Sequence, residues 1–98
     1  MGLNLGPVLR QIRKERNISQ KELAEMLEMT QANLSLTENG KKGVSQVILD
    51  RIEENLGVPA AVLLWKSLTV ESVPSHKRET FVRIKPAIDT LIESLFQD

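Results

Sequence analysis

The sequence predicts an all-helical fold. Apolar residues recur at spacings of three and four along the chain, and no stretch alternates with the period of two that a half-buried strand requires. Capping residues, glycines and prolines interrupt this pattern at short intervals, which indicates short helices rather than long ones. We therefore expect five short helices and an additional helix at the C-terminal end.

Composition excludes several kinds of site. The 98 residues suit one domain, or one domain with an appendage. Without cysteine the chain can form no disulfide, thiolate zinc site or cysteine nucleophile, and its lone histidine, His76, cannot build a multi-histidine metal site. There is also no glycine-rich phosphate-binding loop. We therefore expect no metal, no cofactor and no catalytic residue, and we do not expect an enzyme.

Neither charge nor hydropathy points to a membrane. The 13 Lys and Arg residues balance the 13 Asp and Glu residues, so the chain is not a polycation. The longest near-apolar run, residues 58–65, is far shorter than the roughly 20 residues of a membrane-spanning helix. The first residues also lack the basic and then apolar pattern of a secretory signal. We expect a cytoplasmic location and no membrane association.

The first predicted helix covers residues 6–16. Pro7 lies in its first turn, where an absent N–H group costs no hydrogen bond. Asn17 can adopt the left-handed conformation that ends a helix. The apolar stripe of this helix consists of Val8, Leu9 and Ile12.

Two further helices follow closely. Ser19 can cap the second, and Glu22 three residues later completes a capping box, in which each side chain binds the N–H group of the other residue. This helix is expected to end near Glu28. Thr30 can cap a third helix over residues 31–39, which stops at the glycine that follows.

Two helices complete the predicted domain. Ser45 can cap a fourth helix, which Gly57 closes, and Pro59 opens a short fifth helix. The expected core residues of the fourth helix are Ile48, Ile52 and Leu56. The predicted divisions are residues 1–67 for the five-helix domain, 68–75 for a linker and 76–98 for a C-terminal helical segment.

The C-terminal segment carries an apolar stripe with heptad spacing. Pro86 interrupts the stripe, which favours a kink or two abutting helices. Two alternatives stay open for its partner. The stripe can pack on the fifth helix of its own chain through Trp65, or it can pair with its counterpart in a second subunit. The dimer interface that the second alternative predicts consists of Phe81, Ile84, Ile88, Leu91 and Leu95.

Residues 19–40 carry the main functional signal. Two capped helices are separated by about three residues, and the small Ala24 on the inner face of the first lets their backbones approach. That is the geometry of a helix-turn-helix, whose second helix can enter a DNA major groove. A small helical bundle with an αα-corner has the same spacing, so spacing alone leaves both alternatives open.

The residue types favour the first alternative. Three motifs are present: Ser19-Gln20-x-Glu22-Leu23-Ala24, Thr30-Gln31-x-x-Leu34 and Glu38-Asn39-Gly40. Together they resemble the phage-repressor/Cro-like helix-turn-helix family, often called XRE, over about residues 6–65. The resemblance implies a five-helix repressor-like domain, double-stranded DNA as the partner, and sequence-specific regulation of transcription.

Two positions depart from the pattern of that family. Glu28 stands where the family usually has glycine, so we expect a strained or altered turn. Leu36 stands where the family often has a polar residue. Thr37 stands where the family usually has a large aliphatic residue. Either the third helix is rotated slightly, or Leu36 faces the groove as an apolar contact.

Predicted DNA contacts fall on and beside the third helix. Residues 10–21 carry five basic side chains and one acidic one, so basic residues flank this helix, where phosphate contacts fix its register. The resemblance places Gln20 on the phosphate backbone, and Lys41, Lys42 and the N–H group of Gly43 would hold the other flank. Amide side chains suit adenine and apolar ones suit the thymine methyl group, which predicts a half-site containing A·T pairs. The base-contacting residues would be Gln31, Ala32, Asn33 and Leu36.

The resemblance also implies a structural ion pair. In the family, an arginine of the first helix commonly pairs with the glutamate that precedes the Asn-Gly turn. Here these residues are Arg13 and Glu38. The expected role of the pair is to hold the third helix against the first.

The function predicted first is a repressor that reads a palindromic operator as a homodimer. One helix-turn-helix reads only a few base pairs, whereas a two-fold dimer spaces two such helices by about 34 Å. The alternative is an antitoxin that neutralises a toxin and represses its own operon, because residues 39–45 resemble the corresponding loop of HigA-type antitoxins. A toxin or another regulatory protein is the partner that this alternative implies.

Overall fold

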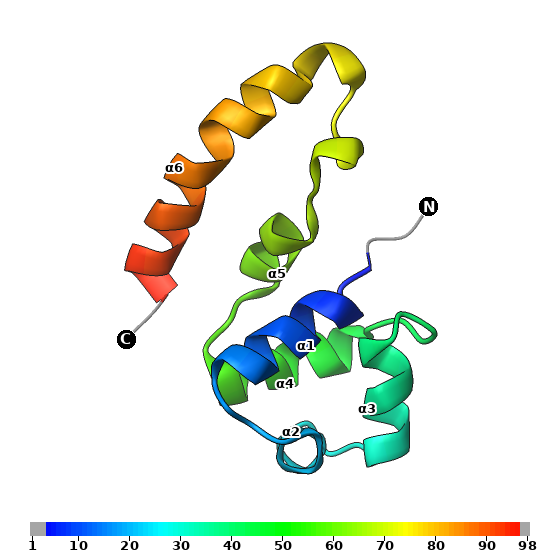
Figure 1. The fold of residues 1–98 in the computed structure, drawn as a ribbon. Helices are drawn as coiled ribbons and strands as arrows, with labels where there is room; N and C mark the ends of the chain where they lie inside the picture. Colours follow the sequence, from blue (N-terminus) through cyan, green and yellow to red (C-terminus); the bar gives the residue numbers. More distant parts are fainter. Residues whose placement is uncertain (1–3, 97–98) are drawn as a thin grey trace. The chain divides into compact units, whose positions relative to one another are not determined.

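The computed structural model of the chain describes residues 4–96. Within these residues there are six α-helices and two short 3-10 helices and no strand, which confirms the predicted all-helical fold (Figure 1). The chain divides into two compact units, Met1–Ser67 and Leu68–Asp98. None of the helices in the described part of the chain is long and apolar enough to cross a membrane.

The first unit contains the five short helices that the sequence predicted. Both ends of most of them agree with the prediction to within one residue. The second helix is the exception, since it ends at Met26 and not near Glu28. The helices are α1 (Gly6–Glu15), α2 (Gln20–Met26), α3 (Gln31–Glu38), α4 (Gln46–Leu56) and α5 (Ala60–Ser67).

Hydroxyl side chains begin three of these helices. The Ser19 Oγ accepts a hydrogen bond from the Glu22 N–H group at 3.0 Å, and Ser19 donates its own N–H group to Glu22 Oε1 at 3.1 Å, so the capping box is complete. Thr30 caps α3 through its side chain, whose Oγ1 accepts a hydrogen bond from the Asn33 N–H group at 3.1 Å. Ser45 begins α4. Each cap satisfies an N–H group that a helix cannot satisfy itself.

The core of the first unit is small and almost wholly aliphatic. Every one of its helices contributes a buried apolar side chain. Ile48, which the sequence predicted as core, is only half-buried because it lies in the first turn of α4, at the edge of the core. The fully buried large side chains are Leu9, Leu23, Leu27, Leu34, Ile52 and Leu63.

The second unit consists of η1 (Val70–Ser72), η2 (Ser75–Lys77) and α6 (Arg78–Phe96). The segment predicted as a linker therefore includes a 3-10 turn. The Arg78 Nε donates to the Val73 carbonyl at 3.0 Å, which ties the start of α6 to the preceding turns.

Pro86 does not divide the last helix. The sequence favoured a kink or two abutting helices at this position, but α6 continues through the proline as a single helix (Figure 1). Proline removes the N–H group that would bind the Val82 carbonyl. Because Val82 is exposed, water can bind that carbonyl instead, which lowers the cost of the interruption.

A close backbone approach joins α1 to α3. A Cβ atom placed on Gly6 would lie 1.7 Å from the carbonyl oxygen of Thr37, far inside van der Waals contact. Only glycine fits at this position, so Gly6 sets the distance between the start of α1 and the end of α3.

This approach predicts that Gly6→Ala destabilises the protein by about 1–3 kcal/mol, as overpacking of a filled interior does. The measurement is a thermal or urea unfolding curve, in which each kcal/mol lowers the Tm by about 4–8 °C for a chain of this size. Gly43→Ala is the matched control, because nothing lies within 4 Å of a Cβ atom there. Equal stability of the two variants would contradict the proposed role of Gly6.

Candidate nucleic-acid interface

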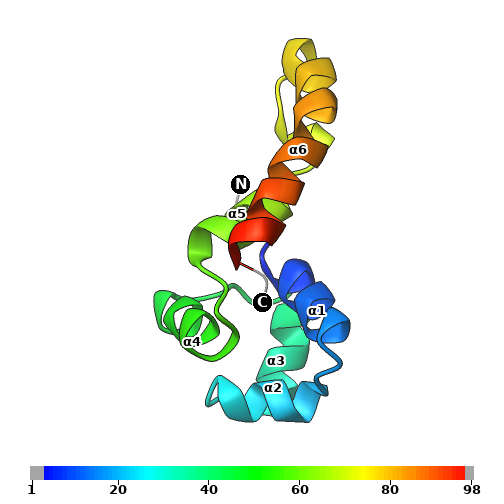
Figure 2. The same cartoon turned by 90° about the vertical axis from the view of Figure 1, so that its left-hand side faces the viewer.

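Helices α2 and α3 form the helix-turn-helix, and Figure 2 shows that they cross at a steep angle. Residues 27–30 join them. Ala24 is buried, as its predicted place on the inner face of the second helix requires, and Leu27 and Leu34 are fully buried. The apolar side of α3 is thereby fixed to the domain, and the opposite side is left for contacts with another molecule.

The turn keeps a glycine-like geometry without a glycine. Glu28 has a φ of 54°, in the left-handed region. The Met29 N–H group donates to the Ala24 carbonyl at 2.9 Å and the Glu28 N–H group to the Glu25 carbonyl at 3.2 Å, which is the Schellman pattern that ends a helix. The turn is therefore strained but not altered, since a left-handed conformation is unfavourable for a residue with a Cβ atom.

Arg51 of α4 holds this turn from the outside. Its Nη1 donates to the Leu27 carbonyl at 3.0 Å, and its Nε lies 3.4 Å from Glu28 Oε2. The guanidinium thus binds a carbonyl that the end of α2 leaves without a helical partner. Sequence reasoning missed Arg51, because it lies 24 residues from Leu27 and nothing in the local pattern joins them.

The outward face of α3 carries three of the four predicted base contacts. Gln31, Ala32 and Leu36 are exposed. Leu36 is 43% exposed, whereas the neighbouring Thr37 is 2% exposed and donates its hydroxyl to the Asn33 carbonyl at 3.0 Å. Leu36 therefore lies on the outward side of α3, as the second alternative for this helix requires, and Thr37 lies on the side that faces the core.

The fourth predicted base contact lies to one side. Asn33 is half-buried, and its Oδ1 accepts a hydrogen bond from Lys42 Nζ at 3.3 Å. Two residues that sequence reasoning did not select share the outward face instead: Asn39 is exposed and Ser35 is half-exposed. Ser35 follows Ala32 by three residues and Asn39 follows it by seven, and this helical spacing is the signal that could have identified them.

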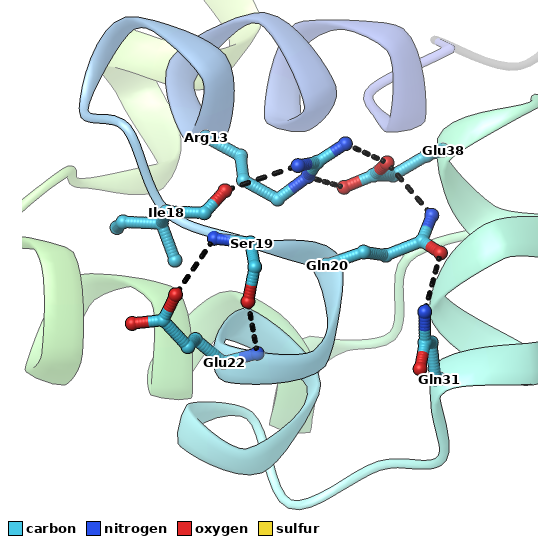
Figure 3. Close-up of polar contacts among 7 residues, drawn as sticks. All are labelled: Arg13, Ile18, Ser19, Gln20, Glu22, Gln31 and Glu38. Carbon is cyan, nitrogen blue, oxygen red and sulfur yellow. Dashed lines mark hydrogen bonds and ion pairs between the residues drawn. The ribbon is translucent and has the colours of Figure 1, made fainter.

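A buried ion pair lies behind this face (Figure 3). The Arg13 Nε lies 2.7 Å from Glu38 Oε2 and its Nη2 lies 3.1 Å from Oε1, so the contact is bidentate. The Glu38 side chain is 2% exposed and that of Arg13 is 13% exposed. Arg13 Nη1 also donates to the Ile18 carbonyl at 3.0 Å. The pair joins α1 to the end of α3 and to the segment that leads into α2.

Gln20 extends this network to the outward face. Its Nε2 donates to Glu38 Oε1 at 3.1 Å, and its Oε1 accepts from Gln31 Nε2 at 3.3 Å (Figure 3). In the structure, Gln20 therefore lies between the buried carboxylate and a predicted base contact. An amide nitrogen carries two hydrogens, so one remains for a phosphate oxygen.

The predicted phosphate contacts after α3 surround an open hollow. Lys41, Lys42 and Gly43 are exposed. The hollow has a volume of about 300 Å³. Its lining comes from the start of α1 and the loop after α3, and consists of Asn4, Leu5, Gly6, Gly40, Lys41, Lys42, Gly43 and Val44.

Two of the basic side chains in residues 10–21 bind groups of the domain itself. Arg13 is committed to Glu38, and Arg16 Nη1 donates to the Leu56 carbonyl at the end of α4. The family resemblance implied the Arg13–Glu38 pair, but no sequence pattern indicated the Leu56 carbonyl, 40 residues away, as the partner of Arg16.

The capping box of α2 depends on the charge of Glu22. Its hydrogen bonds with the side chain and backbone of Ser19 hold the pKa of the Glu22 carboxyl below its ordinary value. A lowered pKa in the folded state means that this contribution is present at neutral pH and is lost as the pH falls through that pKa. Because the carboxyl is at the surface, the contribution is small.

Comparison with known proteins identifies the first unit. A sequence model described as "Helix-turn-helix" matches residues 9–63, which is more than half of the chain. The match contains the whole of α2, α3 and α4. Searches of curated proteins and of solved structures found no match.

The buried pair predicts that Glu38→Ala lowers the free energy of unfolding by about 3–5 kcal/mol, because it leaves the Arg13 charge buried without a partner. The measurement is urea denaturation. Glu79→Ala is the control, since the exposed Glu79–Arg83 pair, at 3.8 Å, should contribute nothing measurable. A Glu38→Ala variant that lost DNA binding but melted like the wild type would contradict the structural role.

The strained turn predicts that Glu28→Gly stabilises the protein by about 0.5–1 kcal/mol, because relief of the left-handed strain exceeds the greater unfolded-state entropy of glycine. Asn17→Gly, at a φ of 56°, should gain less, since asparagine tolerates this conformation. Urea midpoints of the two variants compare these effects. A loss of stability in Glu28→Gly would show that the contact with Arg51 outweighs the strain.

Proposed function

This chain belongs to the phage-repressor/Cro-like helix-turn-helix family of DNA-binding transcriptional regulators, and we propose that it is a repressor that binds a palindromic operator as a homodimer. The observation that carries the proposal is the outward face of α3. That face is exposed and bears an amide and two apolar side chains, while its opposite side is locked into the core. A helix held in this way can enter a major groove about 12 Å wide.

The chemistry of that face suits A·T base pairs. The Gln31 amide can donate to adenine N7 and accept from its amino group, and the exposed Leu36 and Ala32 can contact a thymine methyl group. The Asn33 amide can contact a base only when its Oδ1 gives up the hydrogen bond from Lys42 Nζ. We therefore assign the main base contacts to Gln31, Ala32 and Leu36, with Asn33 at the edge.

Phosphate contacts would fix the register of α3 in the groove. Gln20 has a free amide hydrogen at the start of α2, where unpaired N–H groups favour an anion. On the other flank, the hollow lined by Lys41, Lys42 and the backbone of Gly43 has the charge and the open shape that a phosphate requires. The two flanks lie before and after α3 in sequence, as expected for contacts to the backbone on either side of the groove.

A palindromic operator follows from the small size of one reading unit. A single α3 contacts only a few base pairs, and two copies related by a two-fold axis would read two half-sites about 34 Å apart. We assign DNA binding to residues 1–67, the connection to 68–75 and dimerisation to 76–98. The proposed subunit contact consists of Phe81, Ile84, Ile88, Leu91 and Leu95.

Selection of bound DNA from a random pool should enrich a palindrome whose half-sites contain A·T pairs. Affinity for the selected site should fall steeply with salt, with a slope of about −0.9 for each phosphate contact. Half-sites made of G·C pairs alone would contradict the assigned base contacts. A flat salt response, or no enriched motif, would contradict DNA recognition and favour binding to a protein partner.

Two substitutions separate base contacts from phosphate contacts. Gln31→Ala should cost about 1–3 kcal/mol on the selected operator and relax the preference at one base pair. Lys41→Ala should weaken binding to all sequences and reduce the salt slope by about 1. Titration of both variants against the operator and against unrelated DNA measures the difference. Equal losses on both DNAs for Gln31→Ala would contradict its role in base recognition.

A further inference from the structure

Two residues that the proposed function assigns to the DNA contact bind each other in the structure. The Lys42 Nζ donates a hydrogen bond to Asn33 Oδ1 at 3.3 Å. Asn33 is half-buried on α3, and Lys42 is exposed in the loop that follows this helix. DNA that binds either of these groups therefore has to compete with the hydrogen bond between them.

The turn that ends α3 fixes the position of Lys42. The Gly40 N–H group donates to the Thr37 carbonyl at 3.0 Å and the Lys41 N–H group to the Leu36 carbonyl at 2.9 Å, which is the Schellman pattern. Gly40 has a φ of 76°, in the left-handed region that this pattern requires. The turn brings the chain back beside α3, so the long side chain of Lys42 reaches a residue nine positions earlier.

The backbone of Asn33 is fixed as well, so only its side chain can rearrange. Its N–H group donates to Thr30 Oγ1 at 3.1 Å, and its carbonyl accepts from the Thr37 hydroxyl at 3.0 Å. A bidentate contact with adenine requires Oδ1 to accept from the amino group of the base while Nδ2 donates to N7. Since Oδ1 is held by Lys42, the amide has to leave the lysine before it can bind adenine in this way.

The lysine has a reason to exchange this partner for DNA. A phosphate oxygen attracts the Lys42 ammonium more strongly than a neutral amide oxygen does, because both groups of the new pair are charged. The distance of 3.3 Å also exceeds the roughly 2.7–2.9 Å of a strong charge-assisted hydrogen bond, so the bond to Asn33 is a modest one. A phosphate of any sequence can therefore displace Asn33, at a small cost.

We propose that Asn33 restrains Lys42 and thereby lowers the affinity of this chain for unrelated DNA. On every sequence, the phosphate contact of Lys42 breaks the hydrogen bond with Asn33. On the operator the released amide binds a base and offsets this cost, whereas on unrelated DNA nothing offsets it. Specificity is a difference between affinities, so Asn33 contributes to it partly by weakening the wrong complexes. The proposal rests on the proposed function, which supplies the phosphate and base contacts.

Binding to unrelated DNA tests the restraint. Asn33→Ala should bind a duplex of unrelated sequence about threefold more tightly than the wild type, the effect of one modest hydrogen bond, and should bind the selected operator more weakly. Asn33→Leu, which keeps the branching of the side chain without its polar atoms, should show the same gain on unrelated DNA. In a Lys42→Met background Asn33→Ala should leave this affinity unchanged. Lys41→Met is the matched control, because Lys41 is also exposed and lines the same hollow, so the gain should persist there.

Unchanged or weaker binding of unrelated DNA by both Asn33 variants would overturn the proposal, as would an equal gain in the Lys42→Met background. The contact itself is measured without DNA, since Lys42→Met should shift the NMR signals of the Asn33 side-chain amide and Lys41→Met should not. Equal shifts in the two variants would also overturn it. DNA selection separates the two proposals. An enriched motif with either negative result rejects only the restraint, whereas the absence of any motif rejects the proposed function and the restraint together.

Discussion

The buried Arg13–Glu38 pair is the interaction on which the arrangement of the first unit depends. It joins α1 to the last turn of α3, and the same arginine binds the Ile18 carbonyl before α2. Through Gln20 the network reaches Gln31 on the outward face. Because a buried charge is costly without its partner, the pair tolerates few other positions of α3. A surface that reads bases needs this kind of fixed support.

Three of the 13 Lys and Arg residues stabilise the fold of the first unit through backbone carbonyls. Arg13, Arg16 and Arg51 each donate to a backbone carbonyl near the end of a helix or in a turn. These carbonyl oxygens have no hydrogen-bond partner within a helix. These three arginines are therefore not available to a phosphate backbone. Recognition then relies on where the remaining lysines stand and on the shape of α3 more than on bulk charge.

The two units differ in how much apolar surface they bury. In the first, short helices with few turns each are held by caps, left-handed turns and an aliphatic core, because helices of this length have little stability in isolation. The second has one long helix whose residues are all at least partly exposed. The first unit is organised around its own aliphatic core, whereas the second leaves the apolar residues of its long helix at least partly exposed.

The sequence by itself determined the helices, because their signals are local. Ser19, Thr30 and Ser45 cap helices that start at the next residue, and the motifs of α2 and α3 identified the family. Tertiary structure decided what depends on distant residues: the partners of Arg16 and Arg51, the position of Asn33 beside Lys42, and the outward direction of Leu36. Tertiary structure also decided that α6 continues through Pro86, where exposure of Val82 to water lowers the cost of the lost hydrogen bond. Local propensity acts over a few residues, whereas side-chain partners and burial are set by packing between segments that the sequence keeps far apart.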